Sequence, residues 1–255
     1  MTENVIAISG YTVKQHLRHK VYLSVLIFGL VLVTGALVIS SLSTGRVRML
    51  MNLGLAGIEF LALLTVIFTT VNLVLEEVES RTVYLMLTHP LERWEYLLGR
   101  YIGTVISIMF AMLLMMVLHV GLLVLAGWKP GLFYLAAWLG SAGKVLVVSA
   151  VALVFSLFST SAVSSMSFTV LLWILGHFSE ELRFLGQKSV NVLVKALVWA
   201  VYHVTPNFSY YNYRDFGDAI STPPASWFGW MGIYTLAYLA VCMVLANFLF
   251  SQKEF

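Results

Sequence analysis

Long apolar runs without a charged residue are the feature that most limits what this chain can fold into. The first run covers 21–40, and a helix of that length, at about 1.5 Å per residue, spans about 30 Å, the hydrocarbon thickness of a bilayer. Hydrophobic residues make up 60% of the chain and charged residues 11%, whereas soluble domains carry about 25% charged residues. The polar–apolar alternation typical of a membrane β-barrel is absent. The sequence therefore predicts an all-α membrane protein, a single transmembrane domain over 1–255.

Six long apolar runs, two of which contain a single charged residue, predict six transmembrane helices. They are 21–40, 53–75, 101–125, 132–158, 162–178 and 227–250. An even number places both termini on one side of the membrane, but basic residues divide equally between the two sides and do not orient the chain. Lys144 leaves two alternatives for the fourth run: it lies deep in the membrane, or 131–143 is an interfacial helix and the crossing begins near 144.

Three further segments have an interfacial character. Residues 1–20 interleave basic and apolar side chains, which predicts an N-terminal amphipathic helix, or else a basic flank that only orients the protein. The longest polar interruption is 179–226, and within it apolar residues at helical spacing predict an amphipathic helix over 187–203 that lies on the membrane. An aromatic interfacial loop follows at 206–213. The single cysteine, Cys242, excludes an intrachain disulfide and is expected to be a buried thiol.

The connection between the second and third runs, 76–100, is charged and unusually rich in helix signals. A plain connection needs about two to eight residues. Glu77 and Arg81 are spaced i,i+4 with the acid first, which favours a helix. Pro90 ends that helix and opens another, with Glu92 in its first turn, which continues into the third span. We expect two ordered helices outside the membrane, although a merely solvated loop remains the alternative.

The same connection resembles the signature of the type-2 ABC exporter permeases (the ABC-2 class). In that class an acidic residue precedes a Thr, followed by a Leu pair, a Pro, an Arg and a Gly-Lys before the third span. Here Arg100 replaces the Lys, and Arg81 stands where many members have Gly. The matching stretches are 79–84, 85–87, 90–93 and 97–100. The number of spans, the N-terminal helix and the Pro-Asn-Phe stretch before the last span also resemble this class.

The resemblance implies a partner and an orientation. Residues 76–100 would be a coupling helix seated on a cytosolic ABC ATPase subunit, in two copies, and the permease would pair with a second copy or a close relative. Both termini would be cytoplasmic, in the plasma (inner) membrane of a prokaryote, with membrane lipid around the spans and 179–226 available to an extracytoplasmic partner. The residues expected to couple to the ATPase are Glu77, Glu79, Arg81, Thr82, Leu85, Pro90 and Arg93.

Catalysis is expected to lie in the partner. The chain has no phosphate-binding Gly-Lys-Ser/Thr loop and no protease or esterase motif, so ATP and Mg²⁺ would bind the ATPase, and we expect no cofactor on this chain. A net charge of +3 does not suggest nucleic-acid binding. Two other functions stay open: a secondary transporter, and a membrane scaffold that recruits a soluble partner without transport.

Ionisable residues inside the spans are the remaining candidates for function, because each costs about 2.5–3.5 kcal/mol to insert. Glu59 and Lys144 could pair, or Glu59 could be an interfacial acid that reaches water. His119 and His177 are expected to be satisfied by neighbouring helices or water. A metal site of His177 with Glu180 and Glu181 is a weak alternative, because no second pair of ligands accompanies it.

Overall fold

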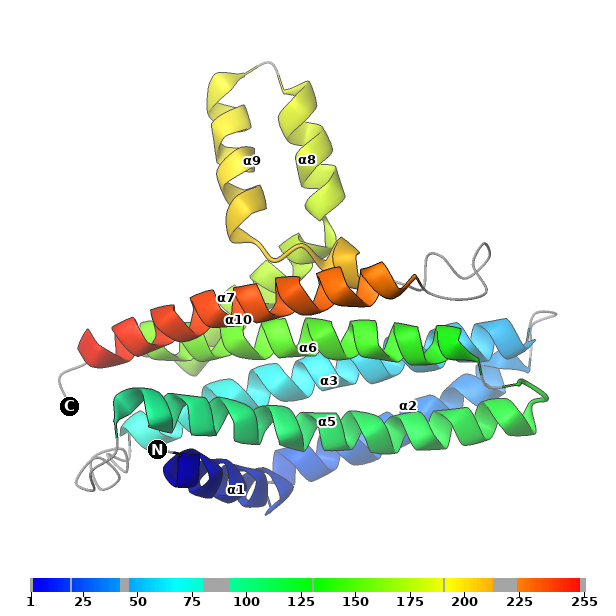
Figure 1. The fold of residues 1–255 in the computed structure, drawn as a ribbon. Helices are drawn as coiled ribbons and strands as arrows, with labels where there is room; N and C mark the ends of the chain where they lie inside the picture. The colour runs from blue at the N-terminus through cyan, green and yellow to red at the C-terminus, as the bar shows by residue number, and fades with distance from the viewer. Residues whose placement is uncertain are drawn as a thin grey trace.

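The computed structural model describes residues 2–18, 20–41, 46–79, 92–129, 131–189, 191–212 and 224–252, and these residues form helices and connecting turns without a strand (Figure 1). In chain order the helices are α1 (Thr2–Arg18), α2 (Lys20–Ser40), α3 (Arg46–Glu79), α5 (Arg93–Leu125), α6 (Leu132–Phe158), α7 (Ala162–His177), α8 (Ser179–Lys188), α9 (Val192–Val204), the 3₁₀-helix η1 (Phe208–Tyr211) and α10 (Ala225–Gln252).

Four of these helices are long and apolar enough to cross a membrane. They are α3 over Arg46–Asn72, α5, α6 and α10, and α7 with α8 would add a fifth although the pair is bent by 69°. The described part of α2 contributes a shorter apolar stretch, Gly29–Val38. The chain is thus an all-helical protein whose apolar helices indicate a multi-pass membrane protein, and the number of six spans stays a prediction.

The long helices pack side by side, with α6 and α3 at the centre (Figure 1). In its most apolar window α6 is 78% buried, whereas α5 is 33% and α10 only 22% buried. Val66 of α3, Met112 of α5 and Val147 of α6 belong to one buried cluster. Because α5 and α10 leave most of their apolar surface outside this bundle, lipid is the natural environment of their outer faces. Cys242 is buried on α10, as its place in an apolar run predicts.

The fourth apolar run forms one unbroken helix, α6, over Leu132–Phe158. The alternative in which 131–143 is a separate interfacial helix is therefore wrong. No proline interrupts the run, and the charge of Lys144 has a partner inside the bundle, so nothing forces a break there.

One prediction about 179–226 needs correction. The helix expected over 187–203 is interrupted: α8 ends at Lys188, and α9 begins at Val192 after Asn191, whose side chain accepts a hydrogen bond from the backbone N–H of Leu193 (2.9 Å). That N-cap starts a new helix, which packs against α8 as a hairpin and projects away from the long helices (Figure 1). The aromatic loop has a mixed environment where it is described: Phe208 and Tyr211 are each 1% exposed and Tyr210 is 51% exposed, and its interfacial position stays a prediction.

One end of the bundle gathers the segments that flank the charged connection. Figure 1 shows α1, the last turns of α3, the first turns of α5 and the end of α10 together at this end. Helix α3 has 34 residues and α5 has 33, so each is about 50 Å long, against about 30 Å of bilayer hydrocarbon. The pair is therefore long enough to extend beyond the apolar layer.

Candidate functional site

The predicted coupling residues lie mostly at the edge of what the structure describes. Arg81, Thr82, Leu85 and Pro90 fall outside the described residues. Glu77 and Glu79 belong to the last turns of α3, where side-chain positions are not described. Arg93 is described, as the first residue of α5. Their role therefore stays a prediction, and the site is built from the part of the connection that is described, 92–100.

This part of the connection is the start of α5. The N-cap is Glu92, one residue before the first turn in which the sequence placed it. Glu95 closes the cap, because its carboxylate accepts a hydrogen bond from the backbone N–H of Glu92 (3.4 Å), which satisfies a donor that the helix itself leaves unpaired. The helix then runs without a break into the third apolar run, as predicted. A displacement of 92–100 would thus move the whole of α5.

Helix α1 is fastened to these first turns through buried polar side chains. The Arg100 guanidinium, 4% exposed, donates hydrogen bonds to the Thr12 hydroxyl (3.0 Å) and the Gln15 side-chain oxygen (2.8 Å). The Asn4 amide donates to the Glu95 carboxylate (3.1 Å). Burial of these charges in hydrogen-bonded contacts holds α1 at one register on α5.

Glycines let the two helices approach closely. A Cβ at Gly103 would lie 2.5 Å from the Thr12 Cβ and 2.7 Å from the Ser9 carbonyl oxygen, and one at Gly99 would lie 2.8 Å from Ile8. Such distances exclude any side chain larger than hydrogen unless α1 moves away. The predicted N-terminal helix, α1, therefore packs closely on α5.

Arg93 links the same end to the last helix. Its guanidinium donates hydrogen bonds to the carbonyl oxygens of Phe250 (3.3 Å) and Ser251 (2.9 Å), which belong to the unpaired carbonyls at the end of α10. The Phe250 ring stacks on the Tyr96 ring with centroids 5.7 Å apart. Three helices, α1, α5 and α10, are thus joined around residues 92–100.

A second polar cluster lies inside the bundle, where α3, α6 and α7 meet. The Lys144 ammonium donates to the Glu59 carboxylate at 2.9 Å, so the structure shows the pairing, one of the two alternatives that the sequence left open for Glu59. Ser141 donates to the other carboxylate oxygen (2.6 Å), and the His177 Nε2 lies 3.8 Å from the first. Glu59 is 5% and Lys144 1% exposed. The ammonium and the carboxylate together carry no net charge, and the extra hydrogen bond satisfies the second carboxylate oxygen.

The histidine of this cluster does not form the metal site that the sequence left open. His177 is close to Glu59, and its Nδ1 lies 3.0 Å from the Trp173 carbonyl oxygen. Within the described ranges no group of three or more metal-binding side chains comes together. Because a carbonyl can only accept, Nδ1 carries the proton toward Trp173.

The turn after the α8–α9 hairpin closes over this cluster. A Cβ at Gly140 would lie 2.3 Å from the Tyr211 carbonyl oxygen, and one at Gly143 would lie 2.5 Å from the Tyr211 ring. The Tyr211 hydroxyl and the Thr235 hydroxyl of α10 are hydrogen-bonded at 2.8 Å, and burial raises the pKa of Tyr211. The small residues of α6 therefore seat η1 beside the ion pair.

The third intramembrane candidate, His119, is satisfied by neighbouring helices, as expected. Its Nε2 lies 3.1 Å from the Leu50 carbonyl oxygen and its Nδ1 2.7 Å from the Tyr134 hydroxyl. The carbonyl must accept, so Nε2 is the protonated nitrogen, and a neutral His119 accepts from Tyr134. The ring fills the space above Gly54, where a Cβ would lie 2.0 Å from Nε2. This arrangement is a helix–helix contact with complete hydrogen bonding.

Sequence reasoning missed the partners of these charged residues. Thr12, Gln15 and Asn4 carry no local signal that they contact α5, and Ser141 is one of many serines in the apolar runs. The run Gly140-Ser141-Ala142-Gly143 is the one available hint, because small residues mark close helix packing in membranes. A scan of the chain against protein-family models finds no match, and a search of curated proteins finds no relative.

Proposed function

We propose that this protein is the membrane subunit of an ATP-driven transporter of the type-2 ABC exporter class, which works as a pair with two ATPase subunits. The resemblance of 79–100 to the coupling segment of that class gives the partner. The proposal places the charged connection on the ATPase, in the cytoplasm of a prokaryotic cell, with both termini on the same side. The chain would be a non-catalytic permease, present as a homodimer or with a close relative.

The observation that carries the proposal is the attachment of 92–100 to three helices at once. Arg100 fixes α1, Arg93 fixes the end of α10, and the residues themselves are the first turns of α5. Packed helices move as rigid bodies because their side chains are close-packed. A push on the adjoining connection would therefore reach α1, α5 and α10 together, which is the property that a coupling segment requires.

The buried Glu59–Lys144 pair favours a second candidate, a secondary transporter driven by an ion or proton gradient. Such proteins place ionisable groups between their helices. In the proposed permease the same pair is structural and keeps α3 against α6. The two functions differ in their energy source: transport by the permease stops when ATP hydrolysis stops, whereas gradient-driven transport stops with an uncoupler.

Photo-crosslinking in native membranes tests the partner. A photoreactive amino acid at Leu85, inside the connection, should capture a protein that contains a phosphate-binding loop, identifiable by mass spectrometry. The matched control is Leu132, which is 60% exposed and starts α6, and which should not capture that protein. Capture at both positions, or at neither, would contradict the coupling role.

ATP turnover tests the coupling itself. In the complex purified with its ATPase, Arg81→Glu and Glu79→Lys should each reduce co-purification and ATP turnover severalfold, because each reverses a charge at the expected contact. Lys129→Glu, beyond the end of α5, is the control and should leave both unchanged. If the two coupling variants behave like the control, the chain is better described as a secondary transporter or a scaffold.

A further inference from the structure

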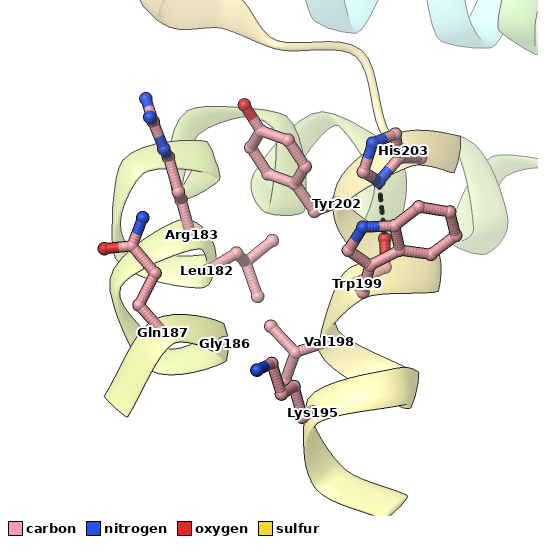
Figure 2. A pocket seen from close by; sticks show the side chains of 9 residues that line it. All are labelled: Leu182, Arg183, Gly186, Gln187, Lys195, Val198, Trp199, Tyr202 and His203. Carbon is pink, nitrogen blue, oxygen red and sulfur yellow. Dashed lines mark hydrogen bonds between the residues drawn. The ribbon is translucent and has the colours of Figure 1, made fainter. Parts of the chain in front are cut away.

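The hairpin of α8 and α9 contains a groove with its own chemistry (Figure 2). Its volume is about 370 Å³. Figure 2 shows Arg183 and Gln187 on the α8 side and Lys195, Trp199 and Tyr202 on the α9 side. The groove is separate from the buried Glu59–Lys144 cluster and from residues 92–100.

The outer surface of α9 is largely apolar. No residue of α9 is buried, and Val192, Leu193 and Leu197 are 78%, 79% and 67% exposed. Trp199 is 65% exposed, and Trp and Tyr side chains are enriched at the boundary between hydrocarbon and water. Exposed apolar side chains along a helix of a multi-pass membrane protein indicate contact with lipid.

The groove between α8 and α9 is positively charged. Arg183 and Lys195 line it, and no acidic residue does. Within the described ranges neither cation forms an ion pair with a carboxylate. Glu180 lies one turn before Arg183 on α8, but it is not part of the groove lining. A cation next to hydrocarbon is unfavourable unless an anion or water accompanies it.

The donors around the groove suit a phosphate group. The planar guanidinium of Arg183 offers a fork of N–H donors that matches phosphate oxygens, and the ammonium of Lys195 adds a second charge. The Gln187 amide and the Tyr202 hydroxyl can donate further hydrogen bonds. Both helices thus contribute a cation and a neutral donor to the same groove.

We propose that the α8–α9 groove binds the phosphate of an anionic phospholipid headgroup, with the acyl chains along the apolar surface of α9. A second copy of the chain is a poorer occupant: a symmetric contact of groove on groove would place four cations together without an acid among the lining residues. The lipid phosphate supplies the negative charge that is absent from the groove lining, and the acyl chains cover the exposed apolar side chains of α9. This site does not depend on the proposed transport function.

Native mass spectrometry of the full-length protein, released from detergent with defined lipids, tests the site. Phosphatidylglycerol should bind about tenfold or more tightly than phosphatidylcholine with the same acyl chains, because charge-assisted hydrogen bonds to the phosphate are not offset by a cationic headgroup. In the double variant Arg183→Gln/Lys195→Gln the preference should vanish.

Lys188→Gln is the matched control. Lys188 is on the same helix and carries the same charge, but its Nζ lies over the Phe184 ring at 4.5 Å from the centroid, outside the groove lining. This variant should keep the preference. The charge-conserving variant Arg183→Lys/Lys195→Arg should restore most of it, which separates lost charge from misfolding.

Three results would overturn the proposal. The first is equal binding of the two lipids to the unaltered protein. The second is an unchanged preference in the double variant whose oligomeric state and unfolding temperature match the unaltered protein. The third is displacement of phosphatidylglycerol by glycerol phosphate at equal concentration, which would identify a site for free phosphate. None of these results involves an ATPase, so failure here leaves the proposed function untouched.

Discussion

Two lysines in apolar surroundings show how differently this protein treats charge in its bundle and in its hairpin. Lys144 is 1% exposed and lies 2.9 Å from Glu59 of another helix. Lys195 is exposed in the α8–α9 groove, whose lining has no acid. The bundle therefore neutralises its own cation, whereas the hairpin leaves two cations available to an external anion. The charge of Lys144 stabilises the fold, and the charge of Lys195 is available to a ligand.

The largest expected effect is the loss of one partner of the buried pair. Glu59→Ala should lower the free energy of unfolding by about 3–5 kcal/mol, because it leaves a buried ammonium without a counter-charge. Unfolding in mixed micelles, followed by circular dichroism, measures it. The double variant Glu59→Leu/Lys144→Met should recover most of the loss, and strictly additive losses would show that the two residues do not act as a pair.

The second largest loss of stability is expected from overpacking the contact between α1 and α5. Gly103→Val places atoms where Thr12 and Ser9 lie, and overpacking of this kind typically destabilises by about 1–3 kcal/mol. Hydrogen exchange should show faster exchange of the α1 amides. Gly57→Ala is the control, because nothing lies within 4 Å of a Cβ there. Equal protection of α1 in both variants would mean that α1 does not depend on this contact.

Loss of a buried hydrogen bond between neutral groups should lower the free energy of unfolding less than loss of the ion pair. Tyr134→Phe removes the hydroxyl that is 2.7 Å from His119 Nδ1, and we expect a loss of about 1 kcal/mol in the free energy of unfolding. The same unfolding assay measures it. A loss as large as that of Glu59→Ala would refute the view that charge, rather than burial, distinguishes the Glu59–Lys144 cluster.

The smallest effect on stability is expected in the hairpin. Without lipid, Arg183→Gln/Lys195→Gln should change the free energy of unfolding by no more than about 0.5 kcal/mol, as exposed substitutions do. Added phosphatidylglycerol should raise the unfolding temperature of the unaltered protein more than that of the variant, because a ligand of the folded state stabilises it. A large loss without lipid would show that these cations support the fold itself.

Much of the fold could be predicted because hydrophobic runs are a local signal. The apolar runs of 101–125 and 132–158 correspond to α5 and α6, and the N-terminal amphipathic segment is α1. The break between α8 and α9 could not be predicted with the same ease, since the apolar spacing continues across it and only the Asn191 cap marks the new helix. The burial of Phe208 and Tyr211 depends on glycines far away in α6 and α7, which no local pattern reveals.

The candidate site divides in the same way. The charged connection and the unusual Glu59 and Lys144 stand out in the sequence, because polar residues are rare in the apolar runs. Their partners do not stand out, because Thr12, Gln15 and Ser141 are ordinary residues whose role comes only from position. The predicted ATPase contacts at Arg81 and Leu85 stay predictions.

By itself the sequence determined that the chain is helical and built for a membrane, because uncharged runs of this length satisfy their backbone hydrogen bonds in lipid only as helices. It also determined where the costly charges are. Only the tertiary structure decided what each charge meets: Lys144 lies against Glu59 of a distant helix, and Arg100 donates to neutral side chains of α1. Arg183 and Lys195 line one groove of the α8–α9 hairpin. Hydrophobicity acts through local composition, but the pairing of charges acts over a few ångströms and depends on how the helices pack.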